Sequence, residues 1–68
     1  MAQVFVVLSV DREARHHAVG VFTTLTLAKE AGERCWEEGE EAAVLPFFLN
    51  AQRGRETWVR DENGWRQY

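Results

Sequence analysis

The apolar and polar positions of the first part of the chain predict two strands. Residues 3–10, QVFVVLSV, are rich in β-branched and aromatic side chains, and this continuous apolar run is typical of a central strand covered on at least one face. A polar connection follows at residues 11–15. Residues 17–22, HAVGVF, then predict a second strand that forms a hairpin with the first.

The next segment has the spacing of an amphipathic helix over residues 25–38. Thr23 and Thr24 precede it, and a threonine hydroxyl can accept a hydrogen bond from a free N–H group of the first helical turn. Gly39 follows the helix and supplies a natural stop. Apolar or small residues recur every three or four positions and predict the face that packs on a sheet: Leu25, Ala28, Ala31, Gly32, Cys35 and Trp36.

The last third of the chain predicts three more strands. The first of them covers residues 43–49, AVLPFFL, and Pro46 cannot donate a ladder hydrogen bond. This strand should therefore lie at an edge of the sheet, or contain a bulge, at least around that residue. A turn follows at residues 50–54. Two short strands are predicted at residues 56–60 and 65–68, with a reverse turn between them at residues 61–64.

Together these elements predict one α+β domain over residues 1–68, in the order β-β-α-β-β-β. An antiparallel sheet of four or five strands should carry the helix on one face. The alternation in the first strand and the stripe on the helix predict a core between the two layers that contains Val4, Val6, Leu8, Val21, Leu25, Ala28, Cys35 and Trp36.

The loop length of the C-terminal hairpin decides which of its side chains share a face. We favour a three-residue loop with Gly64 in the left-handed conformation, because Asp at the first position and Gly at the last suit a type I turn. Trp65 then points inward, and the outer face carries a partner-binding patch of Trp58, Arg60, Arg66 and Tyr68. With a two-residue loop, both tryptophans share a face with Arg60 and close the core, and the contact surface would lie at the acidic end of the helix.

Charge is distributed unevenly along the 68 residues, whose net charge is −3. Residues 1–50 hold four basic and eight acidic side chains, whereas residues 51–68 hold four arginines and three acidic side chains. Arginine suits carboxylate, phosphate and interface contacts, so Arg53 and Arg55 join the candidate partner-binding residues. A secondary acidic patch is predicted at Glu37, Glu38, Glu40 and Glu41.

No catalytic or cofactor signature is visible in the sequence. His16 and His17 are adjacent on a predicted strand, so their rings point to opposite faces and cannot chelate one metal ion as a pair. Cys35 is the single cysteine, which excludes an internal disulfide, and its place on the helix stripe indicates a buried small side chain. We therefore expect a protein that is not an enzyme and binds neither metal nor cofactor.

The N-terminal apolar run is too short to span a bilayer and lacks the features of a signal peptide. We expect a cytoplasmic protein with no membrane partner. Direct nucleic-acid binding is an alternative that rests on the four arginines of residues 51–68 and the nearby rings, because arginine contacts phosphate and aromatic rings stack on bases. Four arginines among three acidic residues give only a shallow positive field.

The pattern VGVFTTLTLAKEA, which opens the helix, and the tryptophan-bearing ending ETWVRDENGWRQY resemble the small inhibitor proteins of bacteriophages and mobile elements. In particular, the chain is similar to a compact type I-F anti-CRISPR protein in length, in an Ala-Lys step such as Ala28-Lys29, and in a tryptophan-containing C-terminal hairpin. That inhibitor type uses a lysine-rich surface, whereas Lys29 is the one lysine here.

The resemblance implies a cofactor-free, one-domain inhibitor that acts by steric occlusion in a bacterial host cell. We therefore expect a non-enzymatic protein-binding module, monomeric or dimeric, that blocks a bacterial protein or nucleoprotein complex. The alternatives are a nucleic-acid-binding accessory protein that uses the C-terminal hairpin, and a structural subunit that self-associates through the edge strand near Pro46.

Overall fold

The computed structural model describes residues 3–49 and 56–68, which form five strands and one helix in the predicted order. The observed bounds lie within one or two residues of the predicted ones. The elements are β1 (Gln3–Val10), β2 (His16–Phe22), α1 (Leu25–Glu37), β3 (Glu41–Phe48), β4 (Trp58–Asp61) and β5 (Gly64–Gln67).

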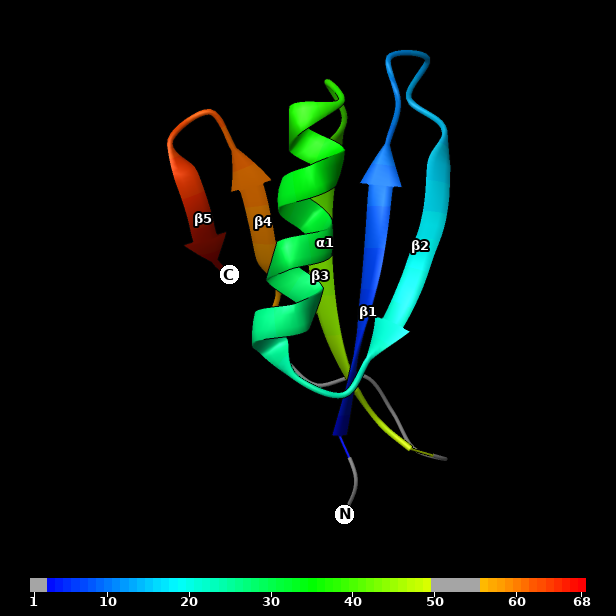
Figure 1. Ribbon diagram of the computed structural model, residues 1–68, viewed down its shortest axis with the longest axis vertical. Coiled ribbons are helices and arrows are strands. Elements are labelled where there is room, and N and C mark those ends of the chain that lie inside the picture. Colours follow the sequence, from blue (N-terminus) through cyan, green and yellow to red (C-terminus); the bar gives the residue numbers. More distant parts are fainter. Residues whose placement is uncertain (1–2, 50–55) are drawn as a thin grey trace.

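The five strands form one antiparallel sheet in the order β2-β1-β3-β4-β5, and α1 packs on one face of it (Figure 1). The helix lies over the middle of the sheet, with β2 on one side of it and the β4–β5 hairpin on the other. The pairing of β1 with β2 shifts between Val7 and Leu8, where β2 contains an extra residue. The predicted α+β class, the strand content and the one-sided helix are confirmed.

Both ends of α1 are capped as the sequence predicts. The Thr24 hydroxyl accepts a hydrogen bond from the Leu27 N–H at 3.2 Å. At the other end Gly39 adopts a positive φ of 87°, and its N–H donates to the Trp36 carbonyl at 2.9 Å. The Glu40 N–H donates to the Cys35 carbonyl at 3.0 Å. These two bonds satisfy carbonyls that would otherwise be unpaired, and they form a Schellman motif, which is why the chain turns back toward the sheet here.

The core lies between α1 and the sheet, and β1 contributes the opposite face from the one predicted. Phe5 and Val7 are buried against the helix, whereas Val4, Val6 and Leu8 lie on the other face. The prediction was wrong because β1 is apolar on both faces, so its alternation does not reveal which face the helix covers. The core cluster comprises Phe5, Val7, Ala28, Ala31 and Val44, with Phe22, Leu25, Trp58 and Trp65 packed around it.

The other members of the predicted core differ in how far they are buried. Cys35 is buried as predicted, and Trp36 is half-buried. Val21 is 64% exposed, because it pairs with Val6 on the face away from the helix. Burial raises the pKa of the Cys35 thiol, and the charges of nearby carboxylates raise it further, so the thiol stays protonated and behaves as a small apolar group.

β3 is a central strand at its start and an edge strand at its end. It pairs with β1 along its whole length, but its pairing with β4 covers only residues 42–44. Pro46 lies beyond that point, where no described strand flanks β3 on the β4 side. The edge position predicted around Pro46 is therefore confirmed locally, although the strand as a whole lies in the middle of the sheet.

The C-terminal hairpin has the two-residue register, so the register that the sequence favoured is wrong. Asp61 pairs with Gly64, and Arg60 pairs with Trp65. The Asp61 carboxylate accepts a hydrogen bond from the Asn63 N–H at 2.8 Å, and Gly64 has a φ of 104°. This register turns both tryptophan rings toward the helix, and burying two large rings outweighs the small preferences between turn types.

Gly32 allows the helix to approach the β4–β5 hairpin. A Cβ atom at Gly32 would lie 2.6 Å from the Trp65 Cη2 atom and 3.4 Å from the Ala42 Cβ atom. Replacing glycine by alanine inside a helix ordinarily stabilises by up to about 1 kcal/mol. Overpacking costs about 1–3 kcal/mol. We expect Gly32→Ala to lower the free energy of unfolding, measured by urea denaturation.

The matched test is the same substitution in a Trp65→Phe background, which removes the ring atoms that collide. There we expect Gly32→Ala to be neutral or stabilising, because only the helix-propensity effect remains. An equal loss of stability in both backgrounds would contradict the proposed contact between Gly32 and Trp65.

Candidate interaction surface

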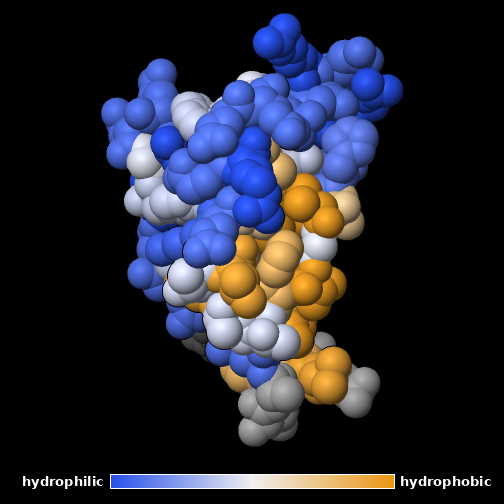
Figure 2. Space-filling view, viewed as in Figure 1, coloured by the Kyte–Doolittle hydropathy of each residue, from blue (hydrophilic) through white to orange (hydrophobic). Residues whose placement is uncertain are grey.

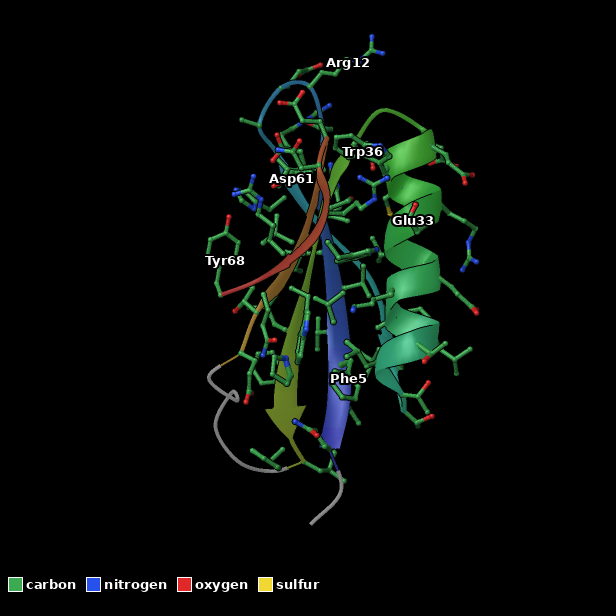
Figure 3. The ribbon with its side chains drawn as sticks, turned by 90° about the vertical axis from the view of Figure 1, so that its left-hand side faces the viewer. Phe5, Arg12, Glu33, Trp36, Asp61 and Tyr68 are labelled. Atoms are coloured by element: carbon green, nitrogen blue, oxygen red, sulfur yellow. The ribbon has the colours of Figure 1, made fainter. Side chains whose placement is uncertain are left out.

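The structure divides the predicted partner-binding patch between the two faces of the sheet. Trp58 and Arg60 lie on the helix side. Arg66 pairs with Val59 on the other side, and Tyr68, which pairs with Thr57 through backbone hydrogen bonds, is 68% exposed there (Figure 3). The structure therefore does not bring these four side chains together. The remaining two candidates, Arg53 and Arg55, lie outside the described residues.

The polar groups of the helix side meet at one carboxylate oxygen. Oε1 of Glu33, on α1, accepts hydrogen bonds from the Arg60 Nε at 2.6 Å and from the Trp65 Nε1 at 2.8 Å. The Arg60 guanidinium lies 4.7 Å from the ring centroid of Trp36 and also donates to the Asp61 carbonyl. The Arg60 side chain is only 17% exposed. Glu33 therefore holds the hairpin against the helix, and Arg60 has a structural role as the partner of Glu33.

Both hairpin tryptophans pack against the core. Trp58 packs edge-on against Phe5, with ring centroids 6.2 Å apart. Trp65 lies between the helix and its own hairpin, and the Lys29 ammonium lies 5.7 Å from its ring centroid. Sequence reasoning assigned Trp58 to a partner, because it followed the wrong hairpin register.

Sequence reasoning missed Asp11, which organises the β1–β2 connection. Its Oδ1 atom accepts hydrogen bonds from the Glu13 and Arg15 N–H groups, both at 2.9 Å. Its Oδ2 atom lies 2.9 Å from the His17 Nε2 and 3.0 Å from the Arg15 Nε. The bond with His17 and the backbone bonds hold the pKa of Asp11 well below its usual range. An Asp at the start of a short polar connection is the signal that could have identified it.

The predicted acidic patch borders the β1–β2 connection. Glu38 and Glu40 line a shallow hollow of about 300 Å³ that also includes Arg12, Arg15 and the acidic pair Asp11 and Glu13, with which Arg15 forms ion pairs. Glu37 ends the helix and is exposed, and Glu41, which begins β3, is exposed as well. The structure therefore does not gather the four carboxylates into one surface of a single sign, and nothing in their arrangement identifies a ligand.

Neither a metal centre nor a membrane-spanning helix is found in the described parts of the chain. No three or more His, Cys, Asp or Glu side chains of residues 3–49 and 56–68 are arranged to hold a metal ion. In the same ranges, no helix has the length and apolar character that a membrane crossing requires.

The face of the sheet opposite α1 carries apolar residues on four strands. In Figure 3 the helix stands on one side of the sheet, and Phe5 points toward it while Tyr68 points away. No described helix or strand lies over the far side. We call this the open face; its apolar residues are Val4, Val6, Leu8, Val10, Ala18, Val21, Ala43, Leu45, Phe47 and Val59.

The charged groups of the open face lie at its rim. Arg66 and Asp61 form an ion pair, with the Arg66 Nε 2.9 Å from the Asp61 Oδ2, near the hairpin turn. Glu41 and His16 lie at the ends of their strands, where both belong to the row that includes Val10. The interior of the face is therefore apolar and uncharged, with a polar rim, which is the anatomy of a protein interface.

The helix side has a different surface. Figure 2 shows hydrophilic residues over its upper part and apolar residues gathered in its lower part, beside β2. Leu27, on α1, is 45% exposed, and Val19, on β2, is 43% exposed. This apolar patch lies at the seam between α1 and β2, whereas the open face is continuous over four strands.

We expect Trp58→Ala to lower the melting temperature by about 10 °C or more, because the half-buried indole leaves a cavity beside Phe5. A loss of about 2 kcal/mol or more is expected, and each kcal/mol corresponds to roughly 4–8 °C in a domain of this size. Tyr68→Ala is the control at an exposed aromatic residue and should shift the melting temperature by less than about 4 °C. Equal effects would show that Trp58 is not part of the core.

The depressed pKa of Asp11 predicts a pH-dependent contribution to stability. In the unfolded chain an aspartate titrates near pH 3.9, above its pKa in the folded protein. As the pH falls below about 4, the unfolded state takes up the proton first, so the stabilisation by Asp11 is present at neutral pH and is lost in acid. Thermal melts should show that Asp11→Asn destabilises at pH 7 and has a smaller effect at pH 2.

The control for Asp11→Asn is Glu30→Gln, which removes one carboxylate charge from an exposed helix position. Its effect on the melting temperature should be small at both pH values. A destabilisation by Asp11→Asn that is the same at pH 7 and pH 2 would contradict the ionic role of the Asp11 carboxylate.

Three comparisons with known proteins found no match: no family model, no curated protein and no solved structure is significantly similar to this chain.

Proposed function

We propose that this protein is a non-enzymatic protein-binding module that binds another polypeptide through its open face. The observation that carries the proposal is the apolar character of β1 and β3 on both faces. An antiparallel sheet with one solvated face normally alternates apolar and polar residues. Here the β1 residues on the open face are Val4, Val6, Leu8 and Val10, all of which are partly exposed.

A contiguous apolar face of this kind marks an interaction site in a soluble protein. The rim of ion-paired and polar side chains supports a protein partner rather than a lipid or a small ligand. A protein partner of fitting chemistry presents an apolar, uncharged surface that can pack on the sheet at a distance of about 10 Å between layers. Rigidity favours such binding, because strand residues lose little conformational freedom on association.

Nucleic-acid binding receives less support than it did from the sequence. Arg15, Arg60 and Arg66 each pair with a carboxylate at 3.0, 2.6 and 2.9 Å. An arginine that neutralises a carboxylate adds little to the field that attracts phosphate. Of the two rings that the sequence offered for base stacking, Trp58 faces the helix, and Tyr68 is exposed on the other face of the sheet. The two rings therefore do not form one platform on which successive bases could stack.

The finer form of the proposal is steric inhibition of a bacterial protein or nucleoprotein complex, as the resemblance to phage inhibitors implies. Steric inhibition requires a rigid face and no catalytic group.

Site-specific photo-crosslinking tests the proposal in cells of the natural host. A benzophenone side chain at Phe47, on the open face, should form a covalent adduct with a polypeptide. The same group at Leu27, which is exposed on the helix, is the matched control and should give little or no adduct. The mass of the adduct identifies the partner as the same chain or a different one. Absence of any adduct at Phe47, with a folded protein, would contradict the proposal.

A further inference from the structure

We infer that the polypeptide that covers the open face is a second copy of this chain, packed sheet on sheet. The inference rests on the proposed function and names its partner. It commits to one arrangement: two sheets face each other through their open faces, and the two helices lie on the outside of the dimer.

The area of the face is close to the area that a stable dimer buries. Neighbouring strands lie about 4.8 Å apart and each residue advances about 3.3 Å, so strands of eight, seven, eight, four and four residues cover roughly 500 Å² of flat sheet. Side chains that stand out of the sheet make the accessible area larger than the flat area. Contact over the whole face thus approaches the roughly 800 Å² per partner that stable complexes bury.

The composition of the face favours a second copy over an unrelated partner. Interfaces between identical subunits are more apolar than interfaces with transient partners, which resemble the rest of the protein surface. The centre of the open face, around Val6, Leu45 and Ala43, holds no charged group for a transient partner to recognise. Arg66 and Asp61 neutralise each other at the rim, so two copies can approach without bringing unpaired like charges together.

Symmetry supports the same arrangement. A two-fold axis between the sheets brings the same apolar surface of both chains into contact, so no second, different surface is needed. Two sheets that pack face to face align their strands within about 30°, as the twist of each sheet requires. With β3 in the middle of the strand order, Leu45 lies near the centre of such an interface and β2 and β5 lie at its edges.

The test is sedimentation equilibrium of the full chain at concentrations from about 1 to 500 μM. We expect a mass that approaches twice the 7.9 kDa of one chain. Leu45→Lys places a charge at the centre of the interface and should raise the dimer dissociation constant at least about thirtyfold, the effect of losing a central interface contact. Leu27→Lys makes the same chemical change on the helix and should leave the dissociation constant unchanged.

A second measurement needs no substitution. In a mixture of isotope-labelled and unlabelled wild-type chains, nuclear Overhauser effects between chains should connect methyl groups of Val6 and Leu45. Intermolecular effects confined to the backbone of β2 would overturn the inference, since they would indicate edge-to-edge pairing. A monomer at 500 μM would overturn it too. If that monomer still crosslinks to a different protein at Phe47, the proposed function stands; without any adduct at Phe47, both fail.

Discussion

The structure depends on one geometric constraint: a single helix cannot cover a five-stranded sheet. An α-helix with its side chains is about 10–12 Å across, whereas the outer strands of this sheet are about 19 Å apart. The helix therefore covers the central strands, and small residues at Ala28, Ala31 and Gly32 let it lie close to them. The rest of the helix side has to be covered by side chains of the sheet itself. The two tryptophans of the hairpin meet that requirement.

Trp58 and Trp65 extend the core beyond the reach of the helix, and Glu33 makes their placement specific. A half-buried carboxylate needs partners, and Glu33 receives N–H bonds from Arg60 and Trp65. These bonds form only in the observed hairpin register, because a shift of one residue would move Trp65 or Arg60 to the other face. Because the same contacts engage the Arg60 guanidinium, it is not available to bind a partner. Two of the residues that made the C-terminal hairpin look like a binding site in the sequence, Trp58 and Arg60, are thus used internally.

Local signals in the sequence were sufficient to predict the elements and their order. Thr24 and Gly39 mark the ends of the helix through hydrogen bonds that involve only neighbouring residues, and such signals do not depend on the rest of the fold. Pro46 likewise correctly indicated an edge position in the part of β3 around that residue. The hairpin register could not be predicted in this way, because it is decided by contacts between residues about thirty positions apart, such as Glu33 and Trp65.

The candidate site was less predictable than the fold for the same reason. The predicted patch required Trp58, Arg60, Arg66 and Tyr68 to share a face, and the register separates them. Asp11 was overlooked for a different reason: its four hydrogen bonds, with Glu13, Arg15 and His17, are local, but composition does not reveal them.

The composition of β1 explains why the sequence predicted the wrong face of this strand for the core. Gln3 and Ser9 are the polar residues of this strand, and both lie on the side that the helix covers, where Ser9 is buried. The opposite row, with Val4, Val6 and Leu8, therefore has the more core-like composition, although the helix leaves it uncovered. A domain this small buries only about 60% of the surface of its unfolded chain, so leaving its best apolar row only half-buried removes stabilisation that it needs. The second layer that we propose over the open face would resolve this conflict, because the described helix and both hairpin tryptophans pack on the other face.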